Sequence, residues 1–162
     1  MKNTNNTNQN LTLRHTLATL AFRGAKALQN TPNNFGEARI AENTRSTVEI
    51  LSHIGDLLEW ASSMVIDQPN WEETPAGSLE EERVRFFSEL TKLDTLLAEN
   101  KTLPCCSNRL FQGPIADALT HIGQLATLSR ISGDGVKHEN YFQAHIEVGS
   151  VGEKQQWSDE EF

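Results

Sequence analysis

Apolar residues recur at three- and four-residue steps in four separate segments, and this periodicity constrains the fold more than any other feature of the chain. Residues at such steps lie on one side of an α-helix, so each segment presents one apolar stripe to a core. The stripes predict four helices: over residues 11–30, from 46 to the turn at 67–70, over 78–97, and from 113–114 to a glycine stop at 133.

Signals for helix ends agree with these limits. Ser46 and Ser78 are each followed three residues later by glutamate, which is the capping-box pattern at a helix start. Pro114 suits the first turn of the last helix, and Gly133 suits its end. Four amphipathic helices predict an all-α fold, specifically an antiparallel four-helix bundle.

The remaining segments set the domain limits. The Asn-rich stretch 1–10 is expected to be a disordered polar terminus, 11–152 the bundle, and 153–162 a flexible acidic tail. Residues 141–148 alternate loosely and predict an irregular C-terminal segment packed on the bundle. No internal repeat or interdomain linker is visible.

Composition argues against two classes of partner. The net charge of −8 repels phosphate backbones, and no basic stripe with interleaved aromatics is present, so nucleic acid is not expected as the ligand. No apolar run approaches the roughly 20 residues that span a bilayer, so no membrane association is expected. The polar N-terminus does not resemble a secretory signal, which makes the cytoplasm the expected compartment.

The two cysteines, Cys105 and Cys106, are adjacent, so a disulfide between them could not cross-link distant parts of the fold. They are expected to be free thiols in a reducing compartment; a reactive thiol or a soft-metal ligand pair is the alternative.

Four polar residues form the candidate site. Asp117, His121 and Gln124 project from one side of the last predicted helix, and His53 lies at the margin of the second helix's apolar face. Imidazole from His53 and His121 with carboxylate from Asp117 is a donor set for one divalent ion, Zn, Ni, Mn or Fe. Three protein ligands leave positions for water, and Gln124 is placed to hold a water or fix a ligand. The alternative is a polar seam, in which Asp117 and His121 form an ordinary intrahelical pair.

Neighbouring residues extend this hypothesis. Glu49 and Asp56 lie one turn either side of His53 and are candidates to orient its second ring nitrogen. His145 is the candidate for a lid over the site, although surface placement is the simpler reading. No glycine-rich phosphate loop, nucleophile elbow or Cys-x-x-Cys motif is present.

The chain resembles the DinB/YfiT-like superfamily of four-helix bundles over about residues 11–151. The resemblance rests on LTLRHTLA (11–18), ILSHIGDLLEW (50–60), LFQGPIADALTHIGQ (110–124) and ENYF (139–142). That superfamily commonly binds one divalent metal through a histidine on its second helix and an H-x-x-x-H pair on its last bundle helix, often followed by Gln. The matching positions are His53, Asp117, His121 and Gln124. Aspartate replaces the first histidine of the pair here, which implies a preference for a harder metal, or a site that is weakened or lost.

The resemblance also implies a function. Relatives include metal-dependent transferases and an isomerase that use low-molecular-weight thiols, and many members are homodimers. The expected activity is therefore a metal-dependent thiol S-transferase or a hydrolase, with a small-molecule ligand such as a low-molecular-weight thiol. A non-catalytic metal- or small-molecule-binding stress protein and a dimeric scaffold with a degenerate site are the alternatives.

Overall fold

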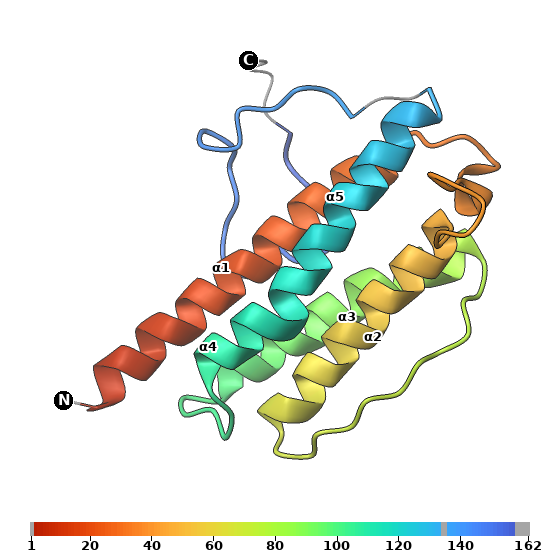
Figure 1. The fold of residues 1–162 in the computed structure, drawn as a ribbon. Coiled ribbons are helices and arrows are strands. Elements are labelled where there is room, and N and C mark those ends of the chain that lie inside the picture. Colours follow the sequence, from red (N-terminus) through yellow and green to blue (C-terminus); the bar gives the residue numbers. More distant parts are fainter. Residues whose placement is uncertain (1, 134–135, 158–162) are drawn as a thin grey trace.

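The computed structural model describes residues 2–133 and 136–157 and is all-helical, with no strand among these residues, which confirms the all-α prediction. Four long helices pack side by side (Figure 1), joined by short helical turns. The elements are α1 (Lys2–Leu28), the 3₁₀ turn η1 (Phe35–Glu37), α2 (Thr47–Val65), α3 (Leu79–Glu99), α4 (Ser107–Leu110), the π-helical turn η2 (Phe111–Ile115) and α5 (Ala116–Ile131).

Both predicted capping boxes form. In α2, Ser46 Oγ accepts from the backbone N–H of Glu49 at 3.3 Å, and the Glu49 carboxylate accepts from the backbone N–H of Ser46 at 2.7 Å. Ser78 and Glu81 make the same reciprocal pair at the start of α3. These bonds satisfy N–H groups that the first helical turn leaves unpaired, so local sequence determines where the two helices begin.

The helix directions require one correction to the predicted antiparallel bundle. Figure 1 shows α1 and α5 running one way and α2 and α3 the other, so α2 and α3 are parallel although consecutive in the chain. The reason is the connection 66–78, which runs back beside α2. At about 3.3 Å per extended residue it easily returns along the 19 residues of α2, which span about 28 Å.

The core lies between the four long helices. Helices α1, α2 and α3 contribute most of the largest fully buried side chains, including Leu17, Leu20, Phe22, Leu51, Ile54, Leu58, Phe86, Leu90 and Leu93. Helix α5 adds the buried Leu125 and Leu128. Helices α1 and α3 pack tightly at Gly24, where an added Cβ would lie 2.6 Å from Cε1 of the buried Phe86 ring. A side chain at Gly24 would therefore force the two helices apart.

Two helix starts differ from the predictions. Helix α1 begins at Lys2, within the segment expected to be disordered, and Asn10 is buried, donating to the backbone carbonyl of Asn100 at 2.7 Å. The last helix has a preceding turn, α4, joined to α5 through the π-helical turn that contains Gly113 and Pro114. Proline has no N–H and clashes with the carbonyl four residues earlier, so the backbone widens at this point.

The C-terminal coil packs on α1, as the sequence suggested. The ring of Phe22 meets Tyr141 edge-on at a centroid distance of 6.3 Å and Trp157 at 5.1 Å. Lys26 forms a buried ion pair with Glu139 of the same coil. Residues 158–162 of the predicted flexible tail lie outside the described residues.

Candidate metal centre

The predicted site residues come together between α2 and α5. His53 projects from α2, and Asp117 and His121, one turn apart, project from α5. The distance from Asp117 to His53 Nε2 is 3.9 Å and that to His121 Nε2 is 3.5 Å. One donor atom from each of the three residues lies within 4.8 Å of the others, so the group could hold a metal ion.

The separations fit a shared ion better than a direct hydrogen bond. A charge-assisted N–H···O bond would bring nitrogen and oxygen to about 2.8 Å. Donor atoms held about 2.1 Å from one tetrahedral ion lie about 3.4 Å apart, and the contacts of His121 with Oδ1 and of His53 with Oδ2 of Asp117, at 3.5 and 3.9 Å, approach this spacing. Two imidazoles and one carboxylate within 4.8 Å of one another are therefore a donor set that could hold a divalent transition metal.

Gln124 fixes the orientation of one imidazole. His121 Nδ1 lies 2.9 Å from Gln124 Oε1, three residues along α5. This contact holds the ring so that its other nitrogen, Nε2, faces the carboxylate of Asp117 at 3.5 Å. In the tautomer that donates from Nδ1 to the amide oxygen, the lone pair of Nε2 is available to a metal ion.

Burial keeps His53 in the form that binds metals. The pKa of His53 is lowered from its ordinary value of 6.5, first because burial disfavours the charged ring and then because Arg45 and His121 lie nearby. The carboxylates of Asp117 and Asp56 oppose this shift. A neutral imidazole near physiological pH is available as a ligand without losing a proton first.

The group is open to solvent on one side. The side chains of His53 and His121 are only 15% and 11% exposed, whereas that of Asp117 is 49% exposed. The His53 and His121 rings meet edge-on at 4.9 Å between centroids. The two imidazoles thus form the floor of the site and the carboxylate its rim.

Trp71 is a neighbour that helical periodicity could not identify. It lies in the connection between α2 and α3, and its ring meets His53 at 6.0 Å and Trp60 at 5.5 Å, both edge-on. Trp71 was visible in the sequence only as an aromatic in a loop, and no spacing relates it to His53. The return of the connection along α2 brings them together.

Three residues considered with the site have other partners. Glu49 caps the start of α2 and pairs with Arg39, and its pKa is lowered to about 2, first by the hydrogen bond from the backbone of Ser46. Asp56 accepts from Arg85 at 2.6 Å. The expectation that Glu49 and Asp56 orient His53 is therefore wrong, because their oxygens are already engaged. His145 is exposed and pairs with Glu147 at 3.1 Å, away from the metal-capable group.

The cysteines lie between α3 and α4 and form no disulfide. Partial burial raises the pKa of the Cys105 thiol. Cys106 is exposed, and its pKa is lowered by backbone N–H groups of Arg109 and Asn108. Neither cysteine belongs to the metal-capable group.

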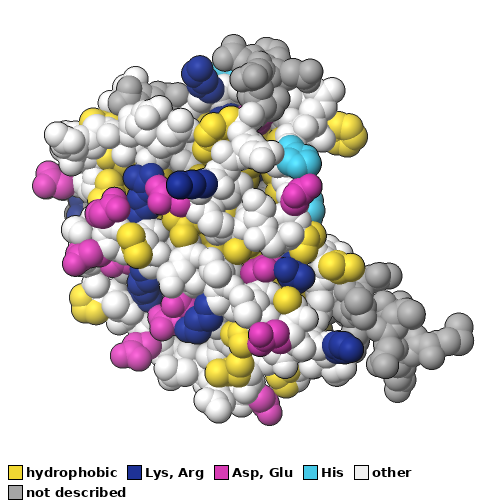
Figure 2. Space-filling view, turned by 180° about the vertical axis from the view of Figure 1, so that it is seen from behind, with side chains coloured by type: hydrophobic (Ala, Val, Ile, Leu, Met, Phe, Trp, Pro, Cys, Tyr) yellow, Lys and Arg dark blue, Asp and Glu magenta, His cyan; other side chains and the backbone are white. Residues whose placement is uncertain are grey.

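Comparison with known proteins gives no match: no family model, curated protein or solved structure is similar to this chain at a significant level. Among the described residues, no helix is both long enough and apolar enough to cross a membrane. On the face shown in Figure 2, acidic and basic side chains are interspersed and the hydrophobic ones form small separate groups.

Proposed function

We propose that this chain binds one divalent transition-metal ion through His53, Asp117 and His121, and that it is a DinB/YfiT-like metal-dependent enzyme of the thiol-transferase or hydrolase type. The observation that carries the proposal is the spacing of the three donors, which leaves room for an ion where hydrogen bonds would have closed the gap. The hydrogen bond from His121 to Gln124 supports it, because it directs Nε2 toward the same point.

The protein groups have distinct roles in this proposal. His53 supplies a neutral nitrogen because burial lowers its pKa. Gln124 acts as a positioning residue through His121, and Asp117 supplies the negative charge that partly neutralises the ion. When bound, the ion would supply a Lewis acid that lowers the pKa of a coordinated water or thiol.

Exposure favours an enzyme over a closed binding site. Two imidazoles and a carboxylate provide three ligands, as in catalytic zinc sites that keep a position open for water or substrate. Asp117, at the rim, is half-exposed, so a small molecule can approach the donors from solvent. No fourth His, Cys, Asp or Glu side chain joins the group among the described residues.

Cobalt(II) substitution tests this proposal. We expect the cobalt-loaded protein to absorb in the visible range and to gain a near-ultraviolet charge-transfer band when a low-molecular-weight thiol is added. His121→Ala should lose both signals, together with any thiol consumption in the presence of an electrophile.

The possible outcomes separate the proposed functions. Cobalt absorption that does not respond to thiol, with no turnover of thiol or ester substrates, supports a non-catalytic metal-binding protein. Thiol consumption that persists in His121→Ala contradicts the metal mechanism.

A further inference from the structure

A second cavity lies on the side of α2 that faces α3 and the connection 66–78. It has a volume of about 400 Å³, is open to solvent on one side, and shares no residue with the three metal donors. Among its lining residues are Glu59, Trp60, Ser62, Asn70, Glu72 and Lys92. Cavities of this size are typical of small-molecule sites.

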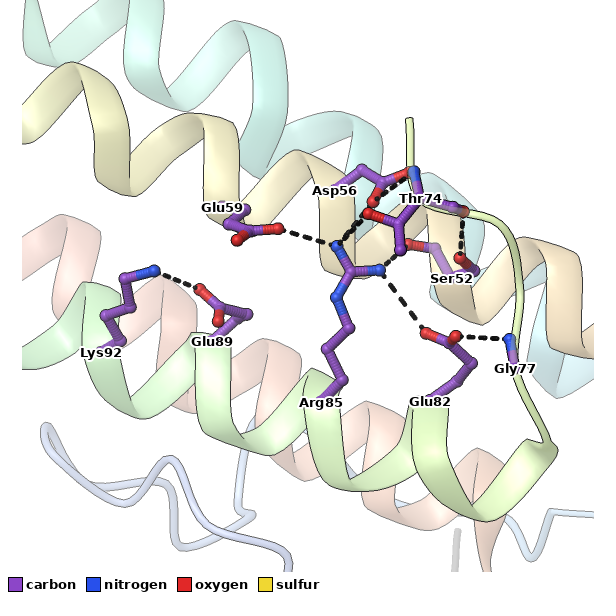
Figure 3. A network of polar contacts seen from close by, with 9 residues as sticks. All are labelled: Ser52, Asp56, Glu59, Thr74, Gly77, Glu82, Arg85, Glu89 and Lys92. Carbon is purple, nitrogen blue, oxygen red and sulfur yellow. Dashed lines mark hydrogen bonds and ion pairs between the residues drawn. The ribbon is translucent and has the colours of Figure 1, made fainter. Parts of the chain in front are cut away.

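The walls of this cavity are held in place. On the connection, the backbone N–H of Asn70 donates to Ser63 Oγ at 3.0 Å, and that of Thr74 donates to the Asp56 carboxylate at 3.3 Å. Figure 3 shows Arg85 of α3 reaching across to Asp56 and Glu59 of α2, at 2.6 and 2.8 Å. Hydrogen bonds therefore hold the connection 66–78 to α2 at two points, and ion pairs of Arg85 hold α3 to the same helix.

Charges of both signs are available across the cavity. Arg85 pairs with Asp56 and Glu59, but no ion pair of Glu72 occurs within the described part of the chain. Among the described residues, Lys92 pairs with Glu89, one turn before it on α3, at 3.1 Å. The Lys92 side chain is half-exposed and such a pair contributes little stability, so Lys92 can exchange Glu89 for the carboxylate of a ligand.

The cavity also offers an apolar surface. Trp60, Ile66 and Leu96 supply the apolar part of its lining. An apolar side chain of a ligand can pack on these three residues and leave water.

We propose that this cavity binds a free α-amino acid with an apolar side chain. Glu72 receives the ammonium group, Lys92 receives the carboxylate, and the side chain packs on Trp60 and Leu96. The opposite charges come from different walls, the connection and α3, so a zwitterion is recognised better than a single ion of either sign. The site does not depend on metal at His53.

Leucine and two of its derivatives test the proposal. Binding of L-leucine, L-leucinamide and N-acetyl-L-leucine would be followed by ¹H–¹⁵N correlation spectra of the metal-free full chain. We expect L-leucine to shift the Trp60 indole and the Asn70 and Lys92 amide signals, and each derivative to bind about tenfold more weakly, because each lacks one charge.

Variants assign the two charges. Lys92→Met should weaken leucine binding without changing leucinamide binding, and Glu72→Gln should weaken leucine binding without changing acetyl-leucine binding. Glu73→Gln is the matched control, since Glu73 is the next residue and lies outside the cavity lining. Equal binding of all three compounds, no shift with leucine, or an effect of Glu73→Gln equal to that of Glu72→Gln would overturn the proposal.

Discussion

The amide of Gln124 determines which nitrogen of His121 faces the other donors. Replacing Gln124 with leucine removes the acceptor for Nδ1–H and releases the ring from this orientation. Loss of such a partner typically weakens metal binding about 10- to 100-fold. We therefore expect Gln124→Leu to lower Zn²⁺ affinity by this factor, measured by competition with a chromogenic chelator. Gln29→Leu, at an exposed glutamine, should leave the affinity unchanged; equal affinities in the two variants would contradict the role of Gln124.

Burial of His53 predicts a pH dependence of the metal-free protein. The pKa of His53 is lower in the folded chain than its ordinary value of 6.5, so below that pH the unfolded chain binds protons more readily than the folded one. The stabilising effect of neutral His53 is fully present above pH 6.5 and is lost as the pH falls below it. The free energy of unfolding, measured in urea, should therefore fall less steeply below pH 6.5 in His53→Gln than in the wild type. Parallel plots of this free energy against pH for the two proteins would contradict the prediction.

Contacts between helices predict opposite effects for two glycines. An added Cβ at Gly24 meets the buried Phe86 ring at 2.6 Å, whereas at Gly123 of α5 it meets nothing within 4 Å. We expect Gly24→Ala to destabilise the fold by about 1–3 kcal/mol through overpacking. Gly123→Ala should stabilise it by about 0.5–1 kcal/mol through helix propensity. Urea unfolding measures both, and stabilisation by Gly24→Ala would mean that α1 and α3 are not packed as described.

Local sequence signals predicted the helices better than their arrangement. The capping boxes at Ser46 and Ser78 are formed by residues three apart, so the sequence alone reveals them. The π-helical turn at Gly113 and Pro114 depends on how α4 and α5 join, and the sequence around Pro114 indicates only the first turn of a helix. The parallel course of α2 and α3 depends on the path of the 66–78 connection, which carries no periodic signal.

Across the whole molecule, the metal-capable group was predictable in part. Asp117 and His121 are one helical turn apart, so their proximity follows from helix geometry alone. The approach of His53 required α2 and α5 to face each other, which helical periodicity does not specify and the DinB resemblance implied. The contact of Trp71 with His53 and the second cavity both depend on the connection 66–78, which packs back on α2. No short-range sequence pattern predicts either of them. The thiol chemistry, the cytoplasmic location and the homodimer stay predictions.

The central claim is that His53, Asp117 and His121 together bind one ion. Its most direct test is the metal content of the tag-free protein, measured by mass spectrometry as purified and after incubation with Zn²⁺, Ni²⁺ or Mn²⁺, beside His53→Ala and a His15→Ala control at an exposed histidine. We predict near-stoichiometric metal in the wild type and in His15→Ala, and its loss in His53→Ala. Absence of metal under every condition, or equal metal content in His53→Ala, would leave the group as a polar seam between α2 and α5.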